Sequence, residues 1–168
     1  MSKDYLKYYK LEDYIFEEVR NNFNKRGYLL SEEFFSIIIW KANRAKTKIK
    51  KRLLERGNVQ KSVKELTGEI YKADNLEEKL NILTKEWGFY LPMATAILTV
   101  LYPKEFTIYD IRVREQLNLK ETASVKKYFS EFLPMVKDFA KKQNLSLRDA
   151  DRYLWGKSFH EDIKKLIK

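Results

Sequence analysis

Apolar residues recur at intervals of three and four along most of this chain, and only five glycines and three prolines interrupt its 168 residues. The run from Leu11 to Phe23 shows the pattern clearly, with Tyr14, Ile15 and Val19 between its ends. This spacing places apolar side chains on one face of a helix, and no stretch shows the sustained period of two typical of a strand. We therefore predict an all-α fold, in which residues 1–168 form one compact multi-helix domain or two helical lobes with a cleft between them.

Capping residues predict where the helices begin and end. The expected N-caps are Ser31, Asp74 or Asn75, Asp110, Ser124 and Ser146, and Gly27 is expected to end the first helix. The predicted helices are 11–23, 31–40, 59–72, 76–87, 91–102, a run from Asp110 through Leu117, a helix from Ser124 to about Gln143 that is kinked or divided at Pro134, and the final helices. The stretch 91–102 is apolar almost throughout, and its length and alanines favour a buried helix over a buried strand.

The composition excludes several kinds of chemistry. Cysteine is absent, so disulfides, thiolate metal sites and cysteine nucleophiles are excluded, and His160 is the single histidine. We therefore expect no metal and no cofactor. No apolar run approaches the roughly 18 residues of a membrane span, and no apolar stretch follows the first lysines. We expect a cytoplasmic protein without a membrane partner.

Positive charge is concentrated in one segment. The chain has a net charge of +10, and residues 41–56 carry eight cations against a single acid, Glu55. Like charges on one helix repel, and a polyanion such as the DNA backbone would relieve that repulsion. Double-stranded DNA is the expected partner, and the candidate contacts in this segment are Lys41, Arg44, Lys48 and Lys51. A solvated Lys-rich surface accounts for the same charge.

A second segment carries the chemical prediction. It reads Trp87-Gly88-Phe89-Tyr90-Leu91-Pro92-Met93-Ala94-Thr95-Ala96, and Asp110-Ile111-Arg112-Val113 follows after a short link. In this span, residues 75–118, the chain resembles the helix-hairpin-helix DNA glycosylase superfamily. That family has a glycine hairpin, a buried helix of small residues, and a catalytic Asp that begins a later helix.

The resemblance implies roles for individual residues. Gly88 and Tyr90 of the hairpin, with Arg112, are expected to contact DNA, and Asp110 is expected to stabilise positive charge on the sugar while a flipped base leaves. The expected lining of the base pocket, or the wedge that replaces the base, is Trp40, Trp87, Phe89 and Tyr109. The family's second hairpin glycine is replaced here, and Pro92 occupies the position of its lyase lysine, which implies a monofunctional enzyme.

Other interpretations of the same residues stay open. Asp110 suits an ordinary helix N-cap as well as catalysis. The chain could be a DNA-binding or RNA-binding protein without activity, or a helical partner of another protein in a defence or toxin–antitoxin pair. Near the C-terminus, Leu154 and Trp155 are expected in the core, and Asp151 and Arg152 are expected to take part in local ion pairing.

Overall fold

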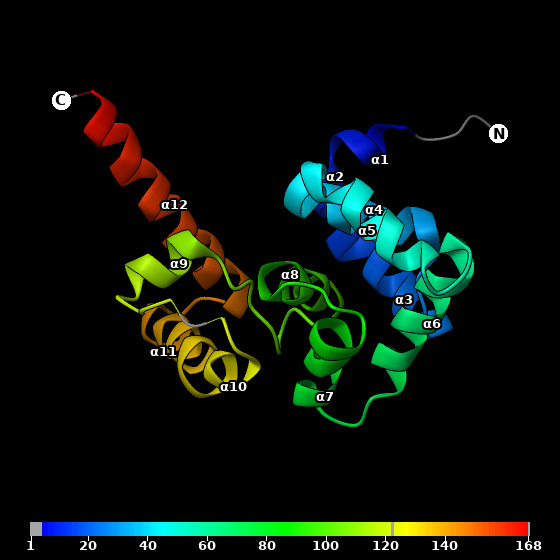
Figure 1. Cartoon of the computed structure of the whole chain (residues 1–168). Coiled ribbons are helices and arrows are strands. Elements are labelled where there is room, and N and C mark those ends of the chain that lie inside the picture. Colours follow the sequence, from blue (N-terminus) through cyan, green and yellow to red (C-terminus); the bar gives the residue numbers. More distant parts are fainter. Residues whose placement is uncertain (1–4, 122, 168) are drawn as a thin grey trace. The chain divides into compact units, whose positions relative to one another are not determined.

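The computed structural model describes residues 5–121 and 123–167, and every regular element within them is helical (Figure 1). The prediction of an all-α fold is therefore confirmed. The chain divides into two compact units, and the boundary falls between Phe89 and Tyr90. This boundary lies inside the segment 75–118, so the hairpin that resembles the glycosylase element lies where the first unit ends.

Unit 1 comprises the residues up to Phe89. Its elements are α1 (Leu6–Tyr9), α2 (Leu11–Asp13), η1 (Tyr14–Val19), α3 (Arg20–Arg26), α4 (Ser31–Ala42), η2 (Asn43–Ala45), α5 (Lys46–Leu54), α6 (Val59–Lys72), α7 (Leu76–Asn81) and η3 (Ile82–Glu86). Helix α4 packs against α2, η1, α5 and α6, and its Phe34, Ile37 and Ile38 are fully buried. This helix forms the centre of unit 1, as its apolar sequence predicts.

The start of α4 differs from the predicted cap. Leu30 is the N-cap and Ser31 is the first helical residue. The carboxylate of the buried Glu33 accepts a hydrogen bond from the Leu30 amide at 2.8 Å, and it also binds the side chains of Asn22 and Arg26. A carboxylate in the first turn thus satisfies the amide at the helix entry, which leaves no capping role for the serine hydroxyl.

Unit 2 comprises the residues from Tyr90 onward. Its elements are α8 (Leu91–Leu101), α9 (Ile111–Gln116), α10 (Val125–Lys127), η4 (Tyr128–Phe132), α11 (Leu133–Gln143) and α12 (Leu147–Leu166). All of α8 is buried except Pro92, which occupies the first turn, where its missing N–H costs nothing. The apolar stretch is therefore a helix, as predicted, and it supplies much of the core of unit 2.

The helix predicted from Ser124 to about Gln143, kinked or divided at Pro134, is helical without a break from Val125 to Gln143 and contains a π turn just before the proline. Ser124 caps α10 as expected, and a π-helical turn, η4, joins α10 to α11. Pro134 lies in the first turn of α11, directly after the π turn. A proline lacks the N–H of an α-helical bond and crowds the carbonyl four residues earlier, and the wider π turn accommodates both effects.

Candidate nucleic-acid interface

The basic segment and the glycine hairpin meet within unit 1. The guanidinium of Arg52 donates to the carbonyl oxygen of Gly88, and that of Arg56 donates to the carbonyl oxygen of Glu86. Arg52 lies in the last turn of α5 and Arg56 lies two residues beyond its end, whereas Glu86 is the last residue of the π turn η3 and Gly88 lies two residues beyond it. Carbonyl groups at a helix end or in the loop just beyond it have no donor from a following helical turn, and the two arginines act as their donors. Two features that are far apart in the sequence, each predicted to contact phosphate, therefore lie side by side.

Most cations of the basic segment face solvent. Ile49 and Leu53 of α5 are buried, and this fixes which side of the helix faces the core. The cations exposed on this segment are Arg44, Lys46, Lys48, Lys50, Lys51 and Arg56, and Lys41 and Arg52 are half-buried. We call these eight residues together with Gly88 the basic surface. The predicted DNA contacts Lys41, Arg44, Lys48, Lys51 and Gly88 all belong to it.

The hairpin glycine has a backbone that favours glycine. Gly88 has a φ of 66°, in the left-handed region that other residues rarely adopt. A Cβ at this position would lie 3.4 Å from the Arg52 guanidinium. Tyr90, the other predicted hairpin contact, is the N-cap of α8 and is 68% exposed. A turn of this kind exposes both backbone and side chain to solvent.

The aromatic residues predicted to line a base pocket are mostly buried. Trp87 is only 2% exposed, its indole Nε1 donates to Glu69 Oε2 at 2.9 Å, and the Arg56 guanidinium lies 4.1 Å from its ring centroid. Phe89 is also buried, with its ring edge-on to Phe34. These contacts give both residues a packing role in unit 1.

The other two aromatic candidates differ in their exposure. Trp40 is half-buried and packs edge-on against Phe16, with ring centroids 5.5 Å apart. Tyr109 is buried in unit 2, where its ring centroid lies 4.9 Å from that of Phe132. Trp40 is therefore the most accessible of the four predicted pocket residues.

Asp110 is the N-cap of α9, and its carboxylate is half-buried. Oδ1 accepts a hydrogen bond from the amide of Arg112 at 3.0 Å, and the backbone at Asp110 is extended. This is the capping geometry that the sequence allows for an Asp at a helix start. Asp110 also directly follows a buried segment, residues 106–109, whose backbone is held by hydrogen bonds to side chains.

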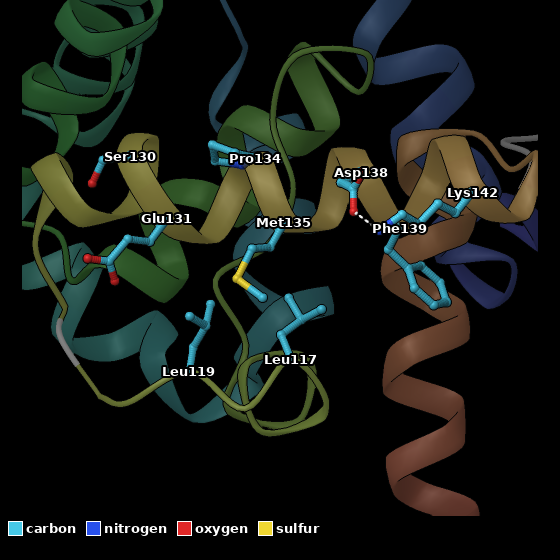
Figure 2. A pocket seen from close by; sticks show the side chains of 9 residues that line it. All are labelled: Leu117, Leu119, Ser130, Glu131, Pro134, Met135, Asp138, Phe139 and Lys142. Atoms are coloured by element: carbon cyan, nitrogen blue, oxygen red, sulfur yellow. Dashed lines mark ion pairs between the residues drawn. The ribbon is translucent and has the colours of Figure 1, made fainter.

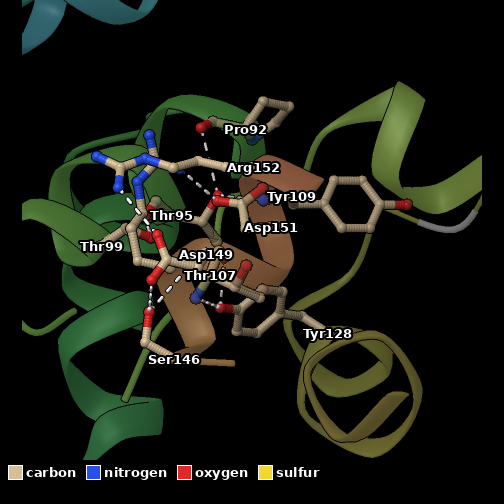
Figure 3. Close-up of polar contacts among 11 residues, drawn as sticks. Pro92, Thr95, Thr99, Thr107, Tyr109, Tyr128, Ser146, Asp149, Asp151 and Arg152 are labelled. Atoms are coloured by element: carbon tan, nitrogen blue, oxygen red, sulfur yellow. Dashed lines mark hydrogen bonds and ion pairs between the residues drawn. The ribbon is translucent and has the colours of Figure 1, made fainter. Parts of the chain in front are cut away.

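That segment is the connector, residues 106–109, which is buried throughout and is not helical. Side chains from three helices bind its backbone (Figure 3). The Thr107 amide donates to the Tyr128 hydroxyl at 3.0 Å, and the Tyr109 amide donates to Thr95 Oγ1 at 2.9 Å. The Ile108 amide donates to the Asp151 carboxylate. A buried backbone without partners would be costly, so these side chains replace the hydrogen bonds of a regular element.

Asp151, whose carboxylate binds the connector, also takes part in a local ion pair on α12. Asp151 is buried and pairs with Arg148 at 2.6 Å, whereas Arg152 pairs with Asp149 at 3.1 Å. The predicted local ion pairing of Asp151 and Arg152 is therefore observed, and each residue pairs with a partner three positions earlier on α12. Burial raises the pKa of Asp151, the Arg148 guanidinium and the Ile108 amide oppose that rise, and the nearby Asp110 adds to it.

Trp155, predicted in the core, is 42% exposed, so that prediction is wrong. Its ring stacks on that of Phe159, with centroids 5.3 Å apart and planes 13° apart. Arg112 lies over both rings, at 5.5 Å and 5.6 Å, and pairs with Asp162 at 2.6 Å. The arginine predicted to contact DNA therefore belongs to an aromatic cluster between α9 and α12. Leu154 is buried as predicted.

A surface pocket of about 600 Å³ lies elsewhere in unit 2 (Figure 2). Its apolar lining comes from Leu117, Leu119, Pro134, Met135 and Phe139, and its charged lining from Glu131, Asp138 and Lys142. None of the predicted site residues lines this pocket, and its two carboxylates oppose the binding of a phosphate.

Residues 5–121 and 123–167 contain no cluster of three or more His, Asp or Glu side chains placed to hold a metal ion. None of the helices in this part of the chain has the length and apolar character needed to span a membrane. Comparison of the chain with protein-family models, with curated proteins and with solved structures finds no match.

Proposed function

We propose that this protein binds DNA through the basic surface of unit 1. The contact between Arg52 and Gly88 carries the proposal, because it joins the exposed cations of α5 to the glycine hairpin. Lysine and arginine side chains neutralise phosphates regardless of base sequence, and a glycine turn lets a phosphate approach the backbone closely. Cations and turn together form one surface that is suited to a DNA strand.

The arrangement of charge on α5 supports the same function. Lys48 and Lys51 lie three positions apart on an exposed face of α5, and Arg44 lies four positions before Lys48 in the preceding turn η2. Like charges at these spacings destabilise a helix by a few tenths of a kcal/mol each. Bound phosphates remove that repulsion, so the segment is better suited to a polyanion than to water alone.

A charge-reversal pair tests the proposal. The variant K48E/K51E removes two cations of the basic surface, and K137E/K141E makes the same change in net charge on α11 of unit 2. We expect the affinity for a 20-base-pair duplex to fall at least tenfold in the first variant and less than twofold in the second. The slope of log affinity against log salt should decrease by about 2 in the first variant.

The outcome separates local binding from general attraction. An equal loss of affinity in both variants would show that only net charge matters, which contradicts a defined basic surface. No binding by the wild-type chain at low salt would refute the proposal outright. Circular dichroism and the unfolding midpoint establish that both variants fold.

Base excision by Asp110 is a second candidate function. The observation that favours it is the connector, whose amides are bound by Thr95, Tyr128 and Asp151, so that the carboxylate after it is held in place. A fixed carboxylate can stabilise the positive charge that develops on a sugar as its base departs. The base must first leave the DNA stack.

The variant Asp110→Asn tests this candidate without disturbing the helix start, because Asn caps helices about as well as Asp. We expect it to abolish base release from a panel of duplexes with modified bases, as measured by the formation of abasic sites. Its DNA affinity should stay within about twofold of wild type. Base release at the wild-type rate, or by neither protein, would exclude catalysis by Asp110 and leave DNA binding as the function.

A further inference from the structure

The stacked pair of Trp155 and Phe159 lies on the solvent side of α12. Their exposed fractions are 42% and 45%, although residues of this size are usually covered. The buried side of the same helix is formed by Ala150, Asp151, Leu154 and Ser158. The two rings are therefore a surface feature and take no part in the core.

The pair is held in a fixed arrangement. Arg112 lies over both rings, and its guanidinium is anchored to Asp162 Oδ2 at 2.6 Å and to Ser158 Oγ at 3.3 Å. Flat rings that are already ordered lose little conformational entropy when another ring stacks on them. Aromatic rings of this kind bind nucleic-acid bases with little dependence on sequence, because every base has a flat π face.

We propose that Trp155 and Phe159 form a stacking platform for an unpaired base of single-stranded DNA. The proposal rests on the proposed DNA-binding function and extends it to a second contact in unit 2 and to a class of substrate with unpaired bases. A base that stacks on either ring buries aromatic surface that is otherwise exposed to water.

The rings lie among charged and polar side chains, which suits a nucleic-acid base better than a wholly apolar protein partner. Arg152 lies three residues before Trp155 and seven before Phe159, so helical spacing places it on the same face. Arg112 adds a second guanidinium beside the rings. Both guanidiniums are ion-paired, Arg112 with Asp162 and Arg152 with Asp149, so the flat rings rather than uncompensated positive charge provide the contact for a base. The same face continues to Ile163 and Leu166, so pairing with a second copy of the chain is the competing outcome.

The test compares alanine variants for binding to a labelled twelve-residue thymidine strand, (dT)12, which has no secondary structure. We expect W155A/F159A to bind (dT)12 about five to 100 times more weakly, the range expected for the loss of one stacked base. Trp155→Phe keeps an aromatic ring and should bind within about threefold of wild type. The matched control is Tyr153→Ala, which removes an exposed ring of the same helix that packs against Phe139.

Tryptophan fluorescence provides a second readout. We expect (dT)12 to quench the emission of the wild-type chain, and we expect most of that quenching to disappear in Trp155→Phe while binding persists. A structural role for Trp155 would not produce this difference. Unfolding curves confirm that each variant folds.

The outcomes distinguish this proposal from the DNA-binding function of unit 1. If K48E/K51E loses duplex binding while W155A/F159A binds (dT)12 as wild type does, the basic surface stands and the platform is refuted. If W155A/F159A alone loses (dT)12 and no variant affects duplex binding, the platform stands and the basic surface is refuted. A change in sedimentation without a change in (dT)12 affinity assigns the face to self-association and refutes the platform.

Discussion

The hydroxyl group of Tyr128 makes both backbone hydrogen bonds of Thr107, accepting from its amide at 3.0 Å and donating to its carbonyl oxygen at 2.8 Å. Both residues are fully buried. The Tyr128 side chain thereby supplies both a donor and an acceptor to the backbone of Thr107, as a neighbouring strand would in a sheet. The relationship makes the connector depend on a residue that follows it by 21 positions.

Tyr128→Phe removes that hydroxyl and keeps the ring. We expect the free energy of unfolding to fall by about 1 to 3 kcal/mol, because a buried amide and a buried carbonyl lose their partner. Urea denaturation followed by circular dichroism measures the change. The control is Tyr153→Phe, an exposed tyrosine that should lose less than about 0.5 kcal/mol. Similar losses in both variants would contradict the role assigned to the Tyr128 hydroxyl.

Two glycines should respond in opposite directions to alanine. Gly88→Ala places a side chain at a φ of 66° and should destabilise unit 1 by about 1 kcal/mol. Gly156 lies within α12, where a Cβ would meet no other atom within 4 Å, so Gly156→Ala should stabilise unit 2 by up to about 1 kcal/mol. Thermal unfolding of both variants measures the shifts. A stabilising effect of alanine at position 88 would contradict the left-handed turn.

The capping role of Asp110 can be separated from its charge. Asp110→Ala should reduce stability by about 1 kcal/mol, because the amide of Arg112 loses its acceptor, whereas Asp110→Asn should leave stability nearly unchanged. Chemical denaturation of the two variants provides the comparison. If Asn and Ala destabilise equally, the negative charge at the helix start, rather than the hydrogen bond, stabilises α9.

The carboxyl groups of Asp149 and Asp151 should titrate on opposite sides of the usual aspartate pKa of 3.8. Burial raises the pKa of Asp151, and hydrogen bonds from Ser146 and Arg152 lower the pKa of the exposed Asp149. The Asp151 contribution to stability should be greatest at low pH and decline as the pH rises above 3.8. The Asp149 contribution should be complete above 3.8 and be lost as the pH falls below it.

Carboxyl carbon chemical shifts measured by NMR across the pH range test this order. Ser146→Ala should raise the pKa of Asp149, since it removes the principal hydrogen bond, and leave that of Asp151 unchanged. A titration of Asp151 below 3.8 would show that its pairing with Arg148 outweighs burial.

Local sequence patterns were sufficient to predict most of the helices. The helix over 59–72 has apolar residues at helical spacing and an Asn58 cap, and its observed bounds match the prediction. Asn75, Ser124 and Ser146 also cap helices as expected. Capping and amphipathic spacing depend on residues within a few positions of each other, so they can be recognised in the sequence.

Long-range contacts could not be predicted in the same way. Thr95 is a hydroxyl residue within an apolar helix, which is a signal of a buried partner, but the sequence does not identify the Tyr109 amide as that partner. Likewise, the basic segment does not reveal that Arg52 contacts Gly88. The exposure of Trp155 could have been predicted from the sequence, because Trp155 and Leu154 are adjacent on a helix and therefore point in different directions.

The connector also bears on how unit 2 folds. Its amides bind side chains at positions 95, 128 and 151, which belong to α8, η4 and α12. A helix forms from contacts between near neighbours, but these bonds close long loops and require all three helices to be assembled. We therefore expect unit 2 to fold more slowly than a helix bundle of its size, with the connector ordering last.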